Sequence, residues 1–399
     1  MAMALSPAQY IAASANDKAV VAKAKALTIL SNNANSKPST TTTATADLSE
    51  QLNEETRNRY EKGRKLGEGT YAVVFKGHLK SDPASLVAIK KIKINANYKD
   101  GLAMDAIREI KFLQELSHPN IIALHAVFTS KNLQLNLVLE FLPRGDLEML
   151  IRDPKNVHYG LADIKAWMVM LSRAVYFCHQ NFVLHRDIKP NNLLIAEDGE
   201  VKLADFGLAR SFADPYEKMT FEVITRWYRP PELLYKARHY SGAIDVWSVG
   251  TVFAELILRK PWMTGTTDID QIDHICQNCG TPLEENWPGV SKLDNYVPPA
   301  PSAIHPIPNK ATWLGNFGTV GPQGVDLLRR MVTLDPSKRI TARGVLEHEW
   351  WISDPRPTKK EQLPKKGGGE EKMGEDLKRT GRDFEADGRV DKVARKLFP

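Results

Sequence analysis

The 399-residue chain predicts an α+β fold, in which a small β-rich part precedes a larger, mainly helical part. Residues 60–93 alternate strand-like runs with glycines, and residues 137–142 form an apolar run typical of a buried strand. A single helix is expected between them, over residues 103–116. From residue 145 onward the pattern is helical, and its predicted core includes Trp167, Met170, Leu171, Ala174 and Phe177.

The formal net charge of +6 is concentrated at the ends of the chain. Residues 355–399 carry +4 and residues 1–60 carry +1, so the rest is nearly neutral. No basic stripe with interleaved aromatic residues occurs, and we therefore expect no direct binding of nucleic acid. No apolar run approaches the roughly 20 residues that a spanning helix needs, and we expect no membrane association.

The two ends also differ from the middle in composition. Residues 1–55 are rich in Ala, Ser, Thr and Asn, which predicts a disordered or accessory extension, with a short helix over residues 16–30 as an alternative. Residues 353–399 are rich in glycine and charge, which predicts an extended, solvated tail. Three cysteines are too few for a disulfide framework and favour a reducing compartment. Cys276 and Cys279 lie in a helical pattern, and we interpret them as structural rather than metal-binding.

The candidate chemistry lies in residues 185–232. Asp187, Lys189 and Asn192 stand at i, i+2 and i+5, and a short hairpin-like segment then leads to Asp205. Two acids and an amide held close together suit phosphoryl transfer. One acid orients a hydroxyl, while the other acid and the amide hold Mg²⁺ on a nucleotide.

A glycine-rich hairpin and a strand ending in a cation precede this segment. Gly67 and Gly69 permit close approach of the backbone to phosphates, whereas Ala72 replaces the usual third glycine. A Rossmann motif is excluded because these glycines lie between two strands. Lys90 ends the next strand, within reach of α- and β-phosphates. Glu109 lies beside the apolar stripe of the following helix, which consists of Ile107, Ile110, Leu113 and Leu116.

These motifs occur in the order typical of eukaryotic protein kinases, and residues 60–352 resemble that family. The resemblance implies a two-lobed fold. A small β-rich lobe with one regulatory helix would span residues 60–140, and a larger, mainly helical lobe would span residues 143–352. ATP and Mg²⁺ would bind between the two lobes.

The resemblance also implies a role for each motif residue. Asp187 would orient the substrate hydroxyl and accept its proton, and Lys189 would stabilise the transferring phosphoryl group. Lys90 would pair with Glu109, and Asn192 and Asp205 would bind Mg²⁺. Leu139 would be the gatekeeper, with the backbone of Glu140 and Leu142 binding adenine. The implied nucleotide site comprises Leu66, Gly67, Glu68, Gly69, Thr70, Tyr71, Ala72, Val74, Ala88, Lys90, Leu139, Glu140, Leu142, Asn192, Leu194 and Asp205.

The activation segment narrows the resemblance to the cyclin-dependent kinases. Thr220 precedes the run Val223-Ile224-Thr225-Arg226-Trp227-Tyr228-Arg229, and Glu222 stands where a mitogen-activated kinase has tyrosine. The resemblance implies that Thr220 is phosphorylated and that its phosphate gathers three arginines. The arginines are Arg108, Arg186 and Arg210. Val223, Ile224 and Arg229 would form a pocket that selects proline after the phosphorylated residue.

Within that family the chain is most similar to the CDK-activating, TFIIH-associated branch. Ala72, the run over residues 107–116, Ser211-Phe212 and Gly280-Thr281-Pro282 carry this resemblance. It implies a cyclin H-like partner, a MAT-type assembly factor, TFIIH subunits and a nuclear location. The implied substrates are the C-terminal domain of RNA polymerase II and the activation loops of other cyclin-dependent kinases.

Two features depart from that branch. The hinge exit over residues 143–146 is one residue longer than usual, and Thr70-Tyr71 resembles the inhibitory phosphosite pair of cell-cycle kinases. A cell-cycle kinase outside TFIIH is therefore one alternative. A catalytically silent cyclin-binding scaffold is the alternative from another functional class.

Overall fold

The structure is a computed structural model that describes residues 42–69, 72–93, 104–132, 134–214, 216 and 218–365. Its contacts divide the chain into residues 1–52 and residues 53–399, and the candidate chemistry lies in the second unit. Within the described ranges, no helix is long and apolar enough to cross a membrane.

The first described element is the helix α3 (Thr42–Arg59), which runs directly into the first strand. The disordered alternative is therefore wrong for residues 42–55. Composition averaged over the whole extension concealed a stretch that contains Ala, Leu and Glu, which are good helix formers. The side-chain amide of Asn53 also accepts from the N–H of Thr129 (2.6 Å) and donates to its carbonyl (3.1 Å). The alternative helix over residues 16–30 lies outside the described residues.

Five antiparallel strands form the sheet of the small lobe, in the order β1-β2-β3-β5-β4. The glycine-rich hairpin forms as predicted, with the Gly69 N–H donating to the Ala72 carbonyl (2.9 Å). Its tip residues, Thr70 and Tyr71, lie outside the described residues. Register places Lys90 opposite Val74 on one side and Leu137 on the other. The strands are β1 (Tyr60–Glu68), β2 (Ala72–Leu79), β3 (Asp82–Ile92), β4 (Leu124–Thr129) and β5 (Leu135–Glu140).

The helix α4 (Met104–Glu115) packs beside β4 and begins and ends within a residue of its predicted bounds. Leu113 and Leu116 are buried as the apolar stripe implies, but Ile107 is 41% exposed. The stripe is therefore wrong at its first position. Because the helix turns Glu109 inward toward Lys90, the residue two positions earlier faces outward.

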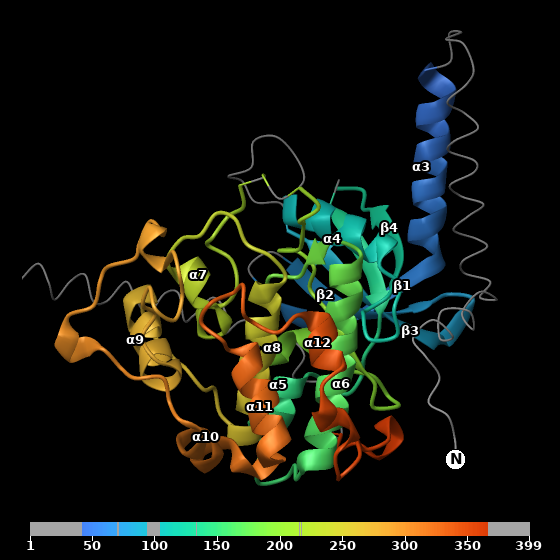
Figure 1. Cartoon of the computed structure of the whole chain (residues 1–399). Coiled ribbons are helices and arrows are strands. Elements are labelled where there is room, and N and C mark those ends of the chain that lie inside the picture. The colour runs from blue at the N-terminus through green and yellow to red at the C-terminus, as the bar shows by residue number, and fades with distance from the viewer. Residues whose placement is uncertain are drawn as a thin grey trace, which may run out of the picture. The chain divides into compact units, whose positions relative to one another are not determined.

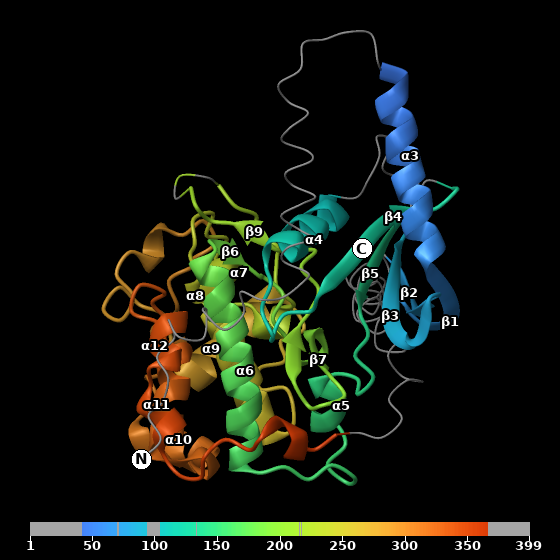
Figure 2. The same cartoon turned by 90° about the vertical axis from the view of Figure 1, so that its right-hand side faces the viewer.

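The large lobe is built mainly from helices, and Figures 1 and 2 show α6 running lengthwise through it. Contacts join α6 to α8 and α12, and α8 to α11. Trp167 and Trp247 fill the core between them, and the three cysteines are buried free thiols. The helices are α5 (Leu147–Ile151), α6 (Leu161–Gln180), α7 (Pro231–Leu234), α8 (Ala243–Leu258), α9 (Asp268–Cys279), α10 (Lys310–Phe317), α11 (Gly321–Met331) and α12 (Ala342–Leu346).

Two short antiparallel ladders position the catalytic segment between the lobes. β6 (Val183–Leu184) pairs with β9 (Arg210–Ser211), and β7 (Leu193–Ile195) pairs with β8 (Val201–Leu203). The second ladder is the predicted hairpin, and its turn uses Gly199 at φ +90°. The predicted α+β fold with two lobes is confirmed.

The C-terminal strap, residues 353–365, packs on the large lobe instead of extending into solvent. Leu363 is 4% exposed and belongs to the core. Thr358 donates its N–H to the Ala162 carbonyl (3.0 Å) and its hydroxyl to Asp163 (2.7 Å). The prediction of an extended tail is therefore wrong for residues 353–365, because a single apolar anchor and specific polar partners outweigh the charged composition.

Candidate active site

Lys90 links two acidic side chains from different elements. Its ammonium donates to both carboxylate oxygens of Glu109 on α4 (2.8 Å each) and contacts Asp205 at 3.4 Å. Glu109 is buried and Asp205 is about half exposed. The Lys90 ammonium lowers the pKa of Asp205. Although burial lowers the pKa of Lys90, its two carboxylate neighbours outweigh burial and raise that pKa overall. The cation therefore remains charged.

The second group surrounds Asp187, on the loop after β6. Lys189 lies 2.9 Å from one carboxylate oxygen of Asp187, and the Asn192 amide donates to that oxygen at 3.0 Å. The Thr225 hydroxyl donates to the other oxygen (3.1 Å) and accepts from Lys189 (3.0 Å). Asp187, Lys189 and Asn192 are thus joined to the activation segment in one network of side-chain contacts.

The loop that carries Asp187 is held by hydrogen bonds to a carboxylate on α8. Asp245 accepts the backbone N–H groups of His185 and Arg186 (2.9 Å each), and His179 lies 2.9 Å from the same carboxylate. Burial lowers the pKa of His185. This favours the neutral ring, whose Nδ1 accepts the Asp187 N–H and whose Nε2 donates to the Ala204 carbonyl.

Strained backbone marks the same region. Arg186 and Asp205 have φ values of +64° and +62°, which non-glycine residues rarely adopt. Such conformations persist only where surrounding contacts enforce them, and they concentrate at functional sites.

Most of the other predicted nucleotide residues that the structure describes lie on the sheet of the small lobe. Leu139 is buried on β5 opposite Ala88, and the Glu140 N–H donates to the Ala123 carbonyl. Leu142 is buried after β5, and Leu194 lies on β7. Leu66 and Gly67 end β1, where Gly67 pairs with Val74.

The glycine-rich hairpin is tied to the end of β3 by a lysine that sequence analysis assigned no role. Lys93 donates to the Gly69 carbonyl (2.8 Å) and pairs with Glu68 (2.7 Å). Thr225 was likewise missed as a bridging residue, since no spacing rule connects it to Asp187. Its position within the activation-segment motif was the available signal.

Arg186 is the centre of the predicted phosphate site around Thr220. It donates to the Thr220 hydroxyl (3.3 Å), the Tyr240 hydroxyl (2.9 Å) and the Leu208 carbonyl (2.7 Å). Burial lowers the pKa of Arg186, and the nearby positive charges of Arg210 and Arg108 lower it further. Arg210 and Arg108 are thus near enough to act electrostatically on Arg186, while Arg108 also pairs with Asp105 (3.1 Å).

In the segment after Thr220, an arginine side chain donates hydrogen bonds to backbone carbonyls of the same segment. Ile224 has φ +68°, and the Arg229 guanidinium donates to the carbonyls of Val223 (3.0 Å) and Ile224 (3.0 and 3.2 Å). The three residues of the predicted proline pocket thus lie together.

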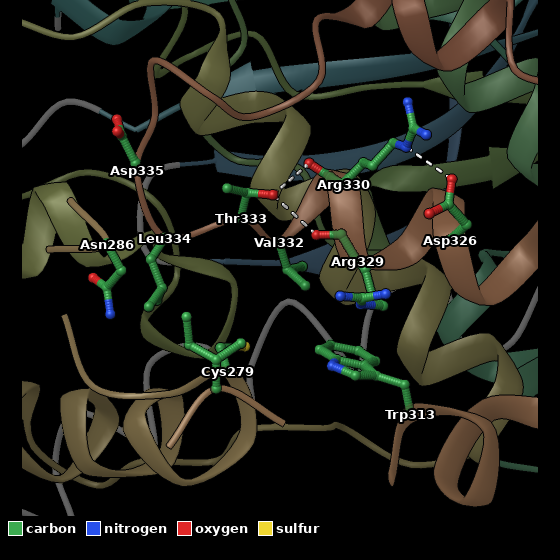
Figure 3. A pocket seen from close by; sticks show the side chains of 11 residues that line it. Cys279, Asn286, Trp313, Asp326, Arg329, Arg330, Val332, Thr333, Leu334 and Asp335 are labelled. Carbon is green, nitrogen blue, oxygen red and sulfur yellow. Dashed lines mark hydrogen bonds and ion pairs between the residues drawn. The ribbon is translucent and has the colours of Figure 1, made fainter. Parts of the chain in front are cut away.

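A separate pocket of about 280 Å³ lies in the large lobe between α9 and α11. Figure 3 shows Arg329 pointing toward Trp313, with Cys279 on the opposite wall. Asp326 lies at the rim, paired with Arg330 (2.8 Å). None of the predicted site residues lines this pocket, so it is separate from the candidate phosphoryl-transfer site.

Comparison with known proteins agrees with this geometry. The protein kinase domain model matches residues 60–351. The chain is 48% identical over 299 residues to serine/threonine-protein kinase KIN28 of Saccharomyces cerevisiae, covering 75% of this chain and 95% of that protein. It is 44% identical over 309 residues to cyclin-dependent kinase 7 of Xenopus laevis, covering 77% and 85%.

A solved structure is also similar. A chain of the CAK complex of Chaetomium thermophilum, bound to ATP-γ-S, superposes with a TM-score of 0.78 at 64% identity. The match covers 80% of this chain and 99% of that one. The chain described here therefore belongs to the protein kinase family, as a serine/threonine kinase of the cyclin-dependent branch that includes KIN28 and cyclin-dependent kinase 7.

Proposed function

We propose that the chain transfers the γ-phosphoryl group of ATP to serine or threonine followed by proline, as the catalytic subunit of a CDK-activating, transcription-associated kinase. The observation that carries this proposal is the joint placement of two networks. One aligns Lys90 between Glu109 and Asp205, and the other fixes Asp187 beside Lys189. Catalysis of phosphoryl transfer depends mainly on such positioning and electrostatic stabilisation.

The residues present fit Mg²⁺. Asp205 supplies a half-exposed carboxylate, and Asn192 donates through its nitrogen to Asp187, which leaves its amide oxygen for a metal. Hard oxygen ligands of this kind suit Mg²⁺ bound together with nucleotide phosphates. When bound, the metal neutralises charge on the phosphates. Lys90 then binds phosphate oxygens, Asp187 orients the hydroxyl and accepts its proton, and Lys189 stabilises the transferring group.

Selectivity for proline follows from the activation segment. Because Arg229 occupies the carbonyls of Val223 and Ile224, these acceptors are not open to the N–H of the next substrate residue. An unpaired buried N–H costs about 1–3 kcal/mol, and proline has none. We expect Ser-Pro peptides to be phosphorylated about 5- to 150-fold faster than matched Ser-Ala peptides. Equal rates would contradict this selectivity.

The partners and substrates are proposed from the relatives. We propose a cyclin H-like partner on α4, where Ile107 is exposed, a MAT-type assembly factor and TFIIH subunits. The proposed substrates are the C-terminal domain of RNA polymerase II and activation loops of cyclin-dependent kinases, within the nucleus. The similarity to KIN28 and to the CAK complex favours this proposal over a cell-cycle kinase outside TFIIH. Phosphorylation of Thr70 and Tyr71 as an inhibitory pair stays a prediction.

Two measurements test the proposal. The chain purified from nuclei should retain a cyclin and TFIIH subunits, identified by mass spectrometry. The same preparation should transfer radiolabelled phosphate to a polymerase C-terminal-domain peptide. Cell-division cyclins as sole companions would favour the cell-cycle alternative. Cyclin binding without any transfer would favour the silent scaffold.

A further inference from the structure

The C-terminal strap reaches the turn of the β7–β8 hairpin. The Lys360 ammonium lies 2.6 Å from Asp198 and 3.1 Å from Glu200, the residues on either side of Gly199. A Cβ on Gly199 would stand 2.0 Å from the Lys360 carbonyl, so the strap backbone lies directly on the turn. At the end of the strap, Lys365 donates to the Glu197 carbonyl (3.1 Å). The strap therefore holds the turn from 197 to 200 through two lysines and one close backbone contact.

Hydrogen bonds continue from that turn into the core of the lobe. Glu200 accepts from the Asn120 amide (3.3 Å), which also donates to the Val201 carbonyl (3.0 Å). Asn120 is 2% exposed, and its own carbonyl accepts the Leu203 N–H (2.8 Å). One buried asparagine thus joins the residue that Lys360 contacts to both ends of β8.

The same path ends at the two proposed metal ligands. Directly after β8, the Ala204 N–H donates to the Asn192 carbonyl (2.9 Å), and Asp205 is the next residue. The backbone that carries both oxygen ligands is therefore tied, through β8 and Asn120, to Glu200 and Lys360.

We propose that Lys360 is a positioning residue for the metal-nucleotide site, acting from the strap through Glu200, Asn120 and β8 on Asn192 and Asp205. The inference rests on the proposed metal-binding role of those two residues. Its consequence is a coupling: anchoring of the strap favours the metal-binding geometry, and binding of metal and nucleotide favours the anchored strap.

The charges of the contact support this assignment. The hydrogen bond from Lys360 to Asp198 leads in raising the pKa of Lys360 to about 12, and Glu200 contributes. The ammonium is therefore charged throughout the physiological range. A neutral side chain of similar length should release the turn without removing a core residue.

The test compares Lys360→Met with two matched variants in the full chain bound to its cyclin. Lys359→Met removes the neighbouring, exposed lysine, whose ammonium forms no ion pair with the hairpin among the described residues. Lys360→Arg keeps the cation. ATP affinity is measured by calorimetry with Mg²⁺ and with EDTA, and amide hydrogen exchange is followed over residues 193–205.

For Lys360→Met we expect ATP affinity with Mg²⁺ to fall roughly threefold, within the range for residues that act through intervening groups. Affinity in EDTA should change less, and exchange over residues 193–205 should accelerate. Lys359→Met should match the wild type, and Lys360→Arg should retain most of the wild-type affinity and protection from exchange.

Equal affinities and equal exchange for Lys360→Met and Lys359→Met would overturn the inference. An equal loss of affinity with Mg²⁺ and with EDTA would also overturn it, since the strap would then act on the nucleotide site in general. If Mg²⁺ leaves ATP affinity of the wild type unchanged, the proposed function fails, and the inference fails with it.

Discussion

The network around Lys90 and the cluster around Thr220 differ in whether their charges are balanced within the protein. In the first, Lys90 is flanked by two carboxylates, so positive and negative charges meet within the protein. In the second, the partners of Arg186 are neutral: two hydroxyls and a carbonyl. The first cluster is balanced before substrate arrives, whereas the second concentrates positive charge that a phosphate on Thr220 would complete. The difference fits the two proposed roles, phosphoryl transfer for the first cluster and regulation by phosphorylation for the second.

The most severe way to break the balanced cluster is to remove its cation. Lys90→Met leaves Glu109 and Asp205 facing each other without a counter-ion, and it removes the group that binds phosphate oxygens. We expect kcat/KM for peptide phosphorylation to fall about 10³-fold, as for other groups that stabilise transition-state charge. Steady-state kinetics of the cyclin-bound enzyme provide the measurement. A loss below tenfold would show that Lys90 is not part of the transfer site.

Thr225 connects the catalytic network to the activation segment, and removing its hydroxyl should separate them. Thr225→Val takes away the donor to Asp187 and the acceptor for Lys189, so both side chains lose a fixed position. We expect kcat to fall up to about 100-fold, the cost of small misplacements at a reacting centre. Thr225→Ser, which keeps the hydroxyl, is the control and should retain most of the activity. Equal losses in both variants would contradict the bridging role.

The arginine cluster around Thr220 should respond to loss of the threonine hydroxyl, which would carry the phosphate. Thr220→Ala keeps the three arginines but offers no site for the dianion, and we expect about a tenfold loss of activity relative to protein phosphorylated on Thr220. Arg210→Ala should lower the activity of the phosphorylated enzyme, yet should change the Thr220→Ala variant little, because both substitutions remove one interaction. Additive losses in the double variant would place Arg210 outside the phosphate site.

A buried carboxyl group in the large lobe sharpens the comparison, because no cation among the described residues forms an ion pair with it. Glu255 on α8 is 1% exposed and accepts from the Tyr228 hydroxyl (2.7 Å). Burial raises the pKa of Glu255 from 4.5 to about 7. The folded state therefore holds the proton more tightly than the unfolded state, and stability falls as pH rises from about 4.5 to about 7.

This sign gives a stability prediction. Relative to Glu255→Gln, the wild type should lose about 1 kcal/mol of unfolding free energy between pH 6 and pH 8. Denaturant unfolding at the two pH values measures the difference. A constant difference between wild type and variant would show that Glu255 is ionised throughout this range.

Sequence patterns predicted the lobes and most of the site because both leave local signals. Asp187, Lys189 and Asn192 are at most five positions apart, and the Gly199 turn lies within one hairpin. Ile107 shows a limit of predicting helix burial from spacing. The spacing identified an apolar stripe, but the contact of Glu109 with Lys90 decided which residues of the helix are buried. Long-range partners leave no periodic signal, so the contact of Lys360 with Glu200 could not be predicted, and the contact of Thr225 with Asp187 was indicated only by the place of Thr225 in the activation-segment motif.

The C-terminal strap shows that composition is also limited as a predictor of packing. Its charge predicted a solvated tail. Instead, the Lys360 ammonium pairs with specific carboxylates on a turn, including Glu200, which lies 160 residues earlier in the sequence. A single apolar residue, Leu363, fixes the segment to the core. Composition describes a segment on average, whereas folding depends on whether individual residues find partners.

Phosphate transfer by Asp205→Asn protein tests the central claim most directly. The substitution keeps the shape of the side chain but removes the charge that faces Lys90 and the proposed metal. With cyclin, radiolabelled ATP and a Ser-Pro peptide, we expect transfer to be abolished while the thermal unfolding midpoint stays close to that of the wild type. Transfer at the wild-type rate would contradict the account, because the constellation around Lys90 would then not be the site of the chemistry.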